Sequence, residues 1–192
     1  TATDALNTAV GYYAGLSVST GVQNTLIGGL AGDALTTGSY NVVVGHEALS
    51  TEDAHGNNVA IGNRALKTLN AGTAGLNTAV GDDAGTAVTS GIRNTLVGSE
   101  AGDALIDADD NVAVGALSLS ADTYGSKSTA IGRGALKVQN FTTASDSHNT
   151  AVGYSAGELV STGIQNTFVG SLAGDATTSS NKNVAIGVNA LS

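Results

Sequence analysis

The nine residues NTAVGYYAG at positions 7–15 contain the pattern on which the fold depends. The same core, N-[T/V]-x-[V/I]-G-x-x-A-[G/L], occurs eleven times and tolerates single departures. The later copies start at Asn24, Asn41, Asn58, Asn77, Asn94, Asn111, Ser128, Asn149, Asn166 and Asn183. Eight of the ten spacings are 17 residues, and the other two are 19 and 21 residues. A fixed internal period of this kind is the signature of a repeat architecture.

The eleven units also form a higher repeat of four. The two longer spacings, Asn58 to Asn77 and Ser128 to Asn149, each close a group of units. The groups open with the closely similar segments NTAVGYYAG, NTAVGDDAG and NTAVGYSAG. We therefore interpret residues 1–192 as a single repeat array with super-repeats at 7–76, 77–148 and, incomplete, 149–192.

The unit length and the local pattern predict an all-β fold. Seventeen residues are too few for the helix pairs of ankyrin or tetratricopeptide arrays, and the alternation within N-T-A-V-G is typical of a short strand. The sequence therefore predicts a parallel β-solenoid, or β-roll, of about eleven 17-residue coils. Coils stacked at about 4.8 Å would give a rod roughly 50 Å long.

Every unit carries Val or Ile at its fourth position, beginning with Val10, Ile27, Val44 and Ile61. We expect this column to stack into a continuous apolar seam inside the coils. The third position should point the opposite way, because side chains alternate along a strand. Since that position is also apolar, the pattern predicts burial on both sides of the strand, with neighbouring chains as cover.

Glycine and asparagine mark two corners of each coil. Gly stands at the fifth position of all eleven units, as at Gly11 and Gly28, which predicts a positive φ or a close backbone approach. Asn opens ten of the eleven units, as at Asn24 and Asn41. Its amide can cap the corner and bond to the Asn above and below, so a ladder is expected.

The ends of the units predict one shared interior. Units that end in Ala-Gly carry an apolar residue three positions later, such as Leu35 or Leu105, with Thr177 after Gly174 as the exception. The third unit of each complete group ends instead in Leu (Leu49 and Leu119) and carries an acid, Glu52 or Asp122, at the later position. We interpret this exchange as one apolar slot filled from alternative points, as a close-packed interior requires.

Composition removes several classes of function. The chain has no Cys, so disulfides and thiolate metal sites are absent, and no apolar run is long enough for a membrane span. Sixteen acids against 7 bases give a net charge of −9, which disfavours nucleic acid and anionic membranes as partners. We expect neither membrane insertion nor a nucleic-acid partner.

No motif predicts catalysis, a metal or a cofactor. Asp146, Ser147 and His148 have the residue types of a catalytic triad, but adjacent residues cannot adopt its geometry. His46 and His55, with Glu47, Glu52 and Asp53, form the one place where a metal site is conceivable. The recurring Asp33, Asp103 and Asp175 lie four coils apart, too far to share a cation, and are interpreted as corner residues.

The segments between the repeated cores are where recognition is expected, with plain corner spacers as the alternative. They comprise residues 50–57, 67–76, 120–127 and 137–148. Tyr124, Phe141 and His148 are the candidate receptor contacts, because exposed aromatic rings stack on sugars and other flat ligands.

The units resemble two known families. They are similar to the head repeats of YadA-type trimeric autotransporter adhesins and to the N-T-A-V/L-G-x-x-A-G repeats of phage tail-fibre proteins, most clearly in NVAIGNRAL at 58–66 and NVAIGVNAL at 183–191. This resemblance implies a left-handed roll, three chains about a threefold axis and a role in surface attachment. The 17-residue coil and the frequent Thr depart from the adhesin pattern, so no receptor-binding residue is carried over.

These observations predict a non-enzymatic fibre or adhesin segment, located outside the cell, on its surface or on a virion. The expected partners are further copies of the chain and a cell-surface glycan or protein receptor. The step from Asn183 to Asn7 of a following copy would be 16 residues, so the chain either belongs to a longer array or stacks end to end. The alternative is a solenoid that binds ice or glycans through a flat face or the loops between strands.

Overall fold

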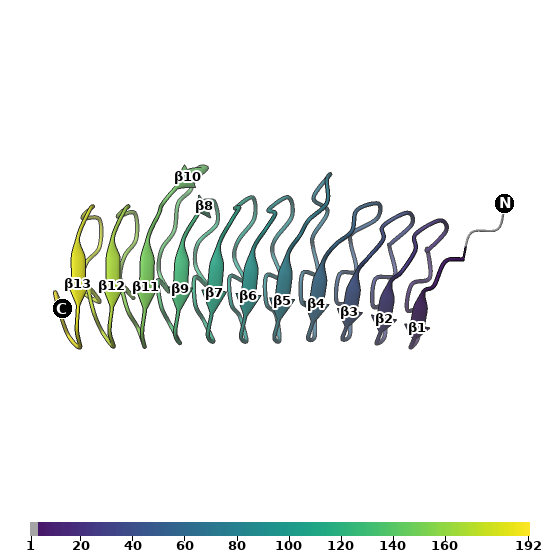
Figure 1. The fold of residues 1–192 in the computed structure, drawn as a ribbon, viewed down its shortest axis with the longest axis horizontal. Coiled ribbons are helices and arrows are strands. Elements are labelled where there is room, and N and C mark those ends of the chain that lie inside the picture. Colours follow the sequence, from purple (N-terminus) through teal and green to yellow (C-terminus); the bar gives the residue numbers. More distant parts are fainter. Residues whose placement is uncertain (1–3) are drawn as a thin grey trace.

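A computed structural model describes residues 4–192, which form one continuous stack of coils without a helix (Figure 1). The first three residues of the predicted array lie outside the described residues. Eleven strands of three residues form the stack: β1 (Thr8–Val10), β2 (Thr25–Ile27), β3 (Val42–Val44), β4 (Val59–Ile61), β5 (Thr78–Val80), β6 (Thr95–Val97), β7 (Val112–Val114), β9 (Thr129–Ile131), β11 (Thr150–Val152), β12 (Thr167–Val169) and β13 (Val184–Ile186).

These strands make a single parallel sheet in chain order, with one strand from each repeat. The register matches equivalent positions, so that Leu26 of β2 lies opposite Val43 of β3. The register is kept across the longer units, where Ile131 pairs with Val152. The predicted parallel β-solenoid of about eleven coils is therefore confirmed. Figure 1 shows the strands side by side along the rod, from β1 at one end to β13 at the other.

Two successive loops of the second super-repeat form a small sheet of their own. Strands β8 (Gly125–Ser126) and β10 (Ser145–Asp146) pair in parallel. They lie outside the main sheet, at the upper edge of the coils in this view (Figure 1). The longer unit therefore extends the stack at this corner without disturbing the main sheet.

The interior column is the third position of each unit, not the fourth. Leu26, Leu96 and Phe168 are fully buried, whereas Ile27 is 38% exposed. The prediction that Val10, Ile27, Val44 and Ile61 line the interior was wrong, because each is exposed or half-buried on the outer face of the sheet. Side chains alternate along each strand as expected, but the third position points inward and the fourth outward, which is the reverse of the prediction.

Side-chain volume explains this direction. The third position varies from Ala to Phe, and its size matches the opposite wall of the coil. A Cβ added to Gly32 would meet Leu26 at 2.9 Å, and one added to Gly157 would meet Phe168 at the same distance. A narrow interior requires such local compensation. The uniform Val and Ile column needs no compensation, because it faces outward.

Both corner predictions are confirmed. The fifth-position Gly residues have φ between 122° and 145°, and a Cβ on Gly28 would collide with the carbonyl group of Gly45 in the next coil. The Asn ladder also forms. The backbone N–H of Asn41 donates to Oδ1 of Asn24 at 2.9 Å, while Nδ2 of Asn24 donates to the carbonyl oxygen of Gly38 at 2.9 Å.

The shared interior is confirmed, but the two kinds of unit do not exchange one apolar slot, because the acids Glu52 and Asp122 at the later position are fully buried as well. Leu35 and Leu105, from units that end in Ala-Gly, are fully buried. Leu49 and Leu119, from units that end in Leu, are equally buried in the same core cluster. The two kinds of unit therefore fill one continuous interior from different points on the coil.

Candidate functional site

The outer face of the main sheet is a regular surface that runs along the rod. It consists of the second and fourth positions of the units, which are two columns of eleven side chains. The second column holds only Thr and Val, and the fourth only Val and Ile. All are β-branched and none is charged, whereas the chain as a whole carries −9. Of these side chains, Val42, Ile131 and Val169 are among the exposed large hydrophobic residues.

The three aromatic candidates from the loops occupy different environments. Phe141 is only 7% exposed, so its prediction as an exposed contact residue was wrong. A Cβ on Gly125 would meet its ring at 2.8 Å, which shows that the ring packs over that glycine. Tyr124 is half-buried, and His148 is exposed with a φ of 49°. The three residues therefore do not form one exposed aromatic site.

A buried polar network holds Phe141 in place. Oδ1 of Asp122 accepts from the backbone N–H groups of Gly125 and Phe141, at 3.1 and 3.0 Å. Nε2 of Gln139 donates to Oδ2 of Asp122 at 2.6 Å and to Oγ of Ser128 at 2.9 Å. Asp122, Gln139 and Ser128 are all fully buried. Since buried polar groups require such partners, the network fixes the loop fold.

Gln139 supplies an amide group at Ser128, the one ladder position without an Asn. Ser128 occupies the ladder position and cannot supply an amide group. Oε1 of Gln139 accepts instead from Nδ2 of Asn149 at 2.8 Å, so the amide comes from another point on the same coil. The sequence contained a signal for this role, because Gln139 replaces an apolar residue of the first super-repeat, Leu69.

The conceivable metal site contains only part of the predicted set. Glu52, Asp53 and His55 offer ligand atoms within 4.8 Å of one another. His46 is exposed and Glu47 pairs with Lys67 at 2.6 Å, so neither belongs to this group.

The buried carboxylate of Glu52 is already engaged. Oε1 accepts from the backbone N–H of His55 at 3.0 Å and lies 3.1 Å from Nδ1 of its ring. Oε2 accepts from the N–H of Ala71 at 3.3 Å. Glu52 thus ties its own loop to the next one, in the way that Asp122 does in the second super-repeat.

The triad-type residues have separate contacts. Asp146 forms an ion pair with Lys127 at 2.6 Å. Ser147 is buried, donates to the carbonyl oxygen of Ser126 at 2.9 Å and also bonds to Ser128. His148 projects at an exposed corner. These contacts make Asp146 and Ser147 parts of the loop structure.

The recurring aspartates share an unusual environment. One side-chain oxygen of each of Asp33, Asp103 and Asp175 is buried without a hydrogen-bond partner among the described residues. Burial raises the pKa of Asp103 to about 6, and the nearby carboxylates of Glu100 and Asp83 add to this rise. Burial likewise raises the pKa of Asp33. The prediction that these aspartates are corner residues did not include the free-energy cost of burying their charged carboxylates.

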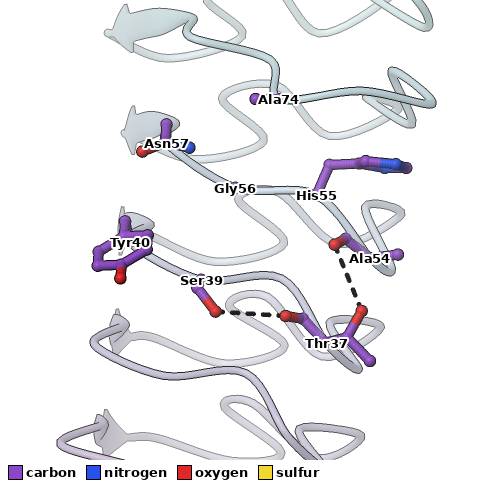
Figure 2. Close-up of a pocket in the computed structure, with 8 residues that line it drawn as sticks. All are labelled: Thr37, Ser39, Tyr40, Ala54, His55, Gly56, Asn57 and Ala74. Carbon is purple, nitrogen blue, oxygen red and sulfur yellow. Dashed lines mark hydrogen bonds between the residues drawn. The ribbon is translucent and has the colours of Figure 1, made fainter.

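A shallow depression of about 290 Å³ lies beside Tyr40 (Figure 2). Tyr40 and His55 stand at opposite ends of it, and Asn57 lies near Tyr40 on the next coil. Between them the surface is low, because Ala54, Gly56 and Ala74 have little or no side chain. Ser39 and Thr37 add hydroxyl groups to the lining. Sequence reasoning selected the loop at 50–57 but did not single out Tyr40.

Comparisons with protein-family models, curated proteins and solved structures gave no match to this chain. Residues 4–192 contain no helix with the length and apolar character needed to cross a bilayer. The function is therefore inferred from the surfaces described above.

Proposed function

We propose that this chain is a segment of a structural fibre or adhesin, located outside the cell, on its surface or on a virion. Its function would be to supply length, stiffness and multivalent display for surface attachment. The observation that carries the proposal is the uncharged, β-branched outer face of the main sheet. Exposed apolar surfaces of this extent mark interaction sites.

The composition of this face favours further copies of the chain as its partner. Its 22 side chains, two columns of eleven, fall within the 20 to 30 residues that a stable interface uses on each side. Interfaces between identical subunits are depleted in charge and rich in apolar area, as this face is. Parallel rods would bring equivalent coils together along their whole length, and a rotation axis along the rod would close the assembly. The family resemblance favours three chains.

The rod shape supports display. The strands run across the rod, and the loops of successive coils line up along one edge of it (Figure 1). An assembly of several parallel chains would present each loop several times, so that weak contacts combine into strong attachment. Stiffness follows from the parallel hydrogen bonds that join each coil to the next.

Sedimentation equilibrium tests this proposal with two single substitutions. Val80→Lys places a charge on the outer face, whereas Ser90→Lys adds the same charge at an exposed position elsewhere. We expect the wild type and Ser90→Lys to sediment as a defined oligomer and Val80→Lys to dissociate. A wild type that remains a single chain at all concentrations would overturn the proposal, as would an oligomer that is insensitive to Val80→Lys.

Binding to ice is a second candidate function, because Thr occupies seven of the eleven second positions of the same face. In the structure this partial Thr column lies beside the Val and Ile column at a regular spacing of about 4.8 Å between coils. Thermal hysteresis of the purified chain distinguishes the two functions. Hysteresis that is lost in Thr95→Lys would favour ice binding, and its absence would leave self-association as the role of the face.

A further inference from the structure

The residue that precedes each ladder position forms a ridge along one corner of the rod. We call this column the corner ridge: Gln23, Tyr40, Asn57, Leu76, Arg93, Asp110, Lys127, His148, Gln165 and Lys182. Every one of these residues has a positive φ. The N–H of Tyr40 donates to the carbonyl oxygen of Val22, and that of Asn57 to the carbonyl oxygen of Ser39, both at 3.1 Å. Successive ridge residues therefore lie one coil apart, about 4.8 Å.

The corner ridge differs in character between the super-repeats. In the second super-repeat three ridge residues, Arg93, Asp110 and Lys127, form ion pairs. Nε of Arg93 lies 2.6 Å from Oδ1 of Asp110, and Lys127 pairs with Asp146. In the first super-repeat the ridge carries no charge. Among the residues drawn in Figure 2, the side chains of Tyr40 and Asn57 make no hydrogen bond, so both remain available to a ligand.

The depression beside Tyr40 is built into the backbone. A Cβ on Gly56 would collide with the carbonyl oxygen of Ser39, so no side chain can fill the floor at that point. Tyr40 is 56% exposed and stands as a wall of the depression. His55, at the other end, is held through its Nδ1 contact with Glu52. Tyr40 and His55 thus lie at the two ends of a low floor, and His55 is held there by Glu52 (Figure 2).

We propose that the depression between Tyr40 and His55 is a binding subsite for one ring of an uncharged saccharide. The apolar face of a pyranose ring packs on the ring of Tyr40, which combines an apolar body with a polar tip. The amide of Asn57, one coil away, supplies a donor and an acceptor for hydroxyl groups. The net charge of −9 disfavours anionic sugars. This subsite deepens the proposed attachment function and gives it a ligand class.

Binding to an array of immobilised neutral and sialylated oligosaccharides tests the subsite. Tyr40→Asn removes the ring with a residue that tolerates a positive φ, so the corner should still fold. We expect the wild type to bind one or more neutral oligosaccharides and Tyr40→Asn to bind about tenfold more weakly. That loss corresponds to about 1.4 kcal/mol, near the upper value for a contact of one aromatic ring. Tyr40→Phe should retain most of the binding.

Tyr154→Asn is the matched control, because it removes another exposed tyrosine from a different part of the surface. Its binding should equal that of the wild type, and circular dichroism should show that all the variants remain folded. Failure of the wild type to bind any neutral oligosaccharide, or equal binding by Tyr40→Asn, would overturn the subsite. Sedimentation reports on the fibre separately: an oligomer that binds no sugar refutes only the subsite, and a single chain that binds sugar refutes only self-association.

Discussion

The backbone N–H of Asn111 donates to Oδ1 of Asn94 in the preceding coil at 3.0 Å, and both residues are fully buried. Asn94 also donates from Nδ2 to the carbonyl oxygen of Ala108 at 2.7 Å, within its own coil. One side chain therefore closes a corner and joins two coils. Repetition of this arrangement along the rod gives the coils their common register.

Removal of one ladder amide should destabilise the rod. Asn94→Ala leaves the N–H of Asn111 and the carbonyl oxygen of Ala108 without partners in the interior. Because each unsatisfied buried group costs about 1 to 3 kcal/mol, we expect a loss of about 2 to 4 kcal/mol in urea unfolding. Asn63→Ala, which removes an exposed bond to Asp82, is the control and should cost less than about 1 kcal/mol. Equal losses would contradict the structural role of the ladder.

The fifth-position glycines that have a following coil should tolerate no side chain. A Cβ on Gly98 would lie 2.6 Å from the carbonyl carbon of Gly115, and its φ is 135°. We expect Gly98→Ala to destabilise the chain by more than about 3 kcal/mol in urea unfolding. Gly72→Ala separates collision from strain, because Gly72 has a φ of 69° but nothing within 4 Å of its Cβ position. Gly72→Ala should destabilise the chain by only about 1 to 2 kcal/mol. A similar loss of stability for Gly98→Ala would contradict the close approach of the Gly98 and Gly115 backbones.

Acidification should stabilise the chain through Asp103. Its pKa is about 6 in the folded state, against about 3.9 when unfolded. The folded state therefore binds the proton more tightly, and stability from this group increases as the pH falls through 6 towards 4. We expect Asp103→Asn to melt at a higher temperature than the wild type at pH 7.5, with the difference vanishing near pH 4. A difference that does not change with pH would contradict this effect.

Gln139 and Ser128 should be energetically coupled. Gln139→Leu removes the amide that bridges Asp122, Ser128 and Asn149, and so should destabilise the chain in urea unfolding. The double variant with Ser128→Asn restores the combination present in the first super-repeat, Asn58 with Leu69. We expect the double variant to lose less stability than the sum of the two single variants. Simple additivity would show that Gln139 does not replace the missing ladder amide.

The sequence predicted the architecture because its local signals are repeated in unit after unit. Glycine at a positive φ and asparagine at a corner each have a specific chemical role, so Gly28 and Asn24 could be placed correctly. The inward direction of the strands could not be read from alternation alone, since both faces are apolar. The informative signal was side-chain size. The third position, which holds Leu26 and Phe168, changes in size with the opposite wall of the coil, whereas the fourth position is always Val or Ile.

The candidate site was less predictable, because exposure of a loop residue depends on contacts between coils. Phe141 lies in the longest insertion, but Asp122 draws its backbone inward, and its ring covers Gly125. Tyr40 belongs to a unit of ordinary length and carries no local signal of exposure. Its availability becomes visible only in the stacked structure, where the small residues of the next two coils leave the depression beside it (Figure 2).

The direction of the strand side chains is tested most directly by the accessibility of a single introduced cysteine. The chain has no Cys, so the variants Leu96→Cys and Val97→Cys each contain a single thiol. The thiol lies on one face of β6 in the first variant and on the other face in the second. The measurement is the labelling rate with a maleimide, at a dilution where the chain does not associate. We expect rapid labelling at position 97 and labelling at position 96 only after unfolding. Faster labelling at position 96 would mean that the Val and Ile column faces the interior, opposite to the structure described.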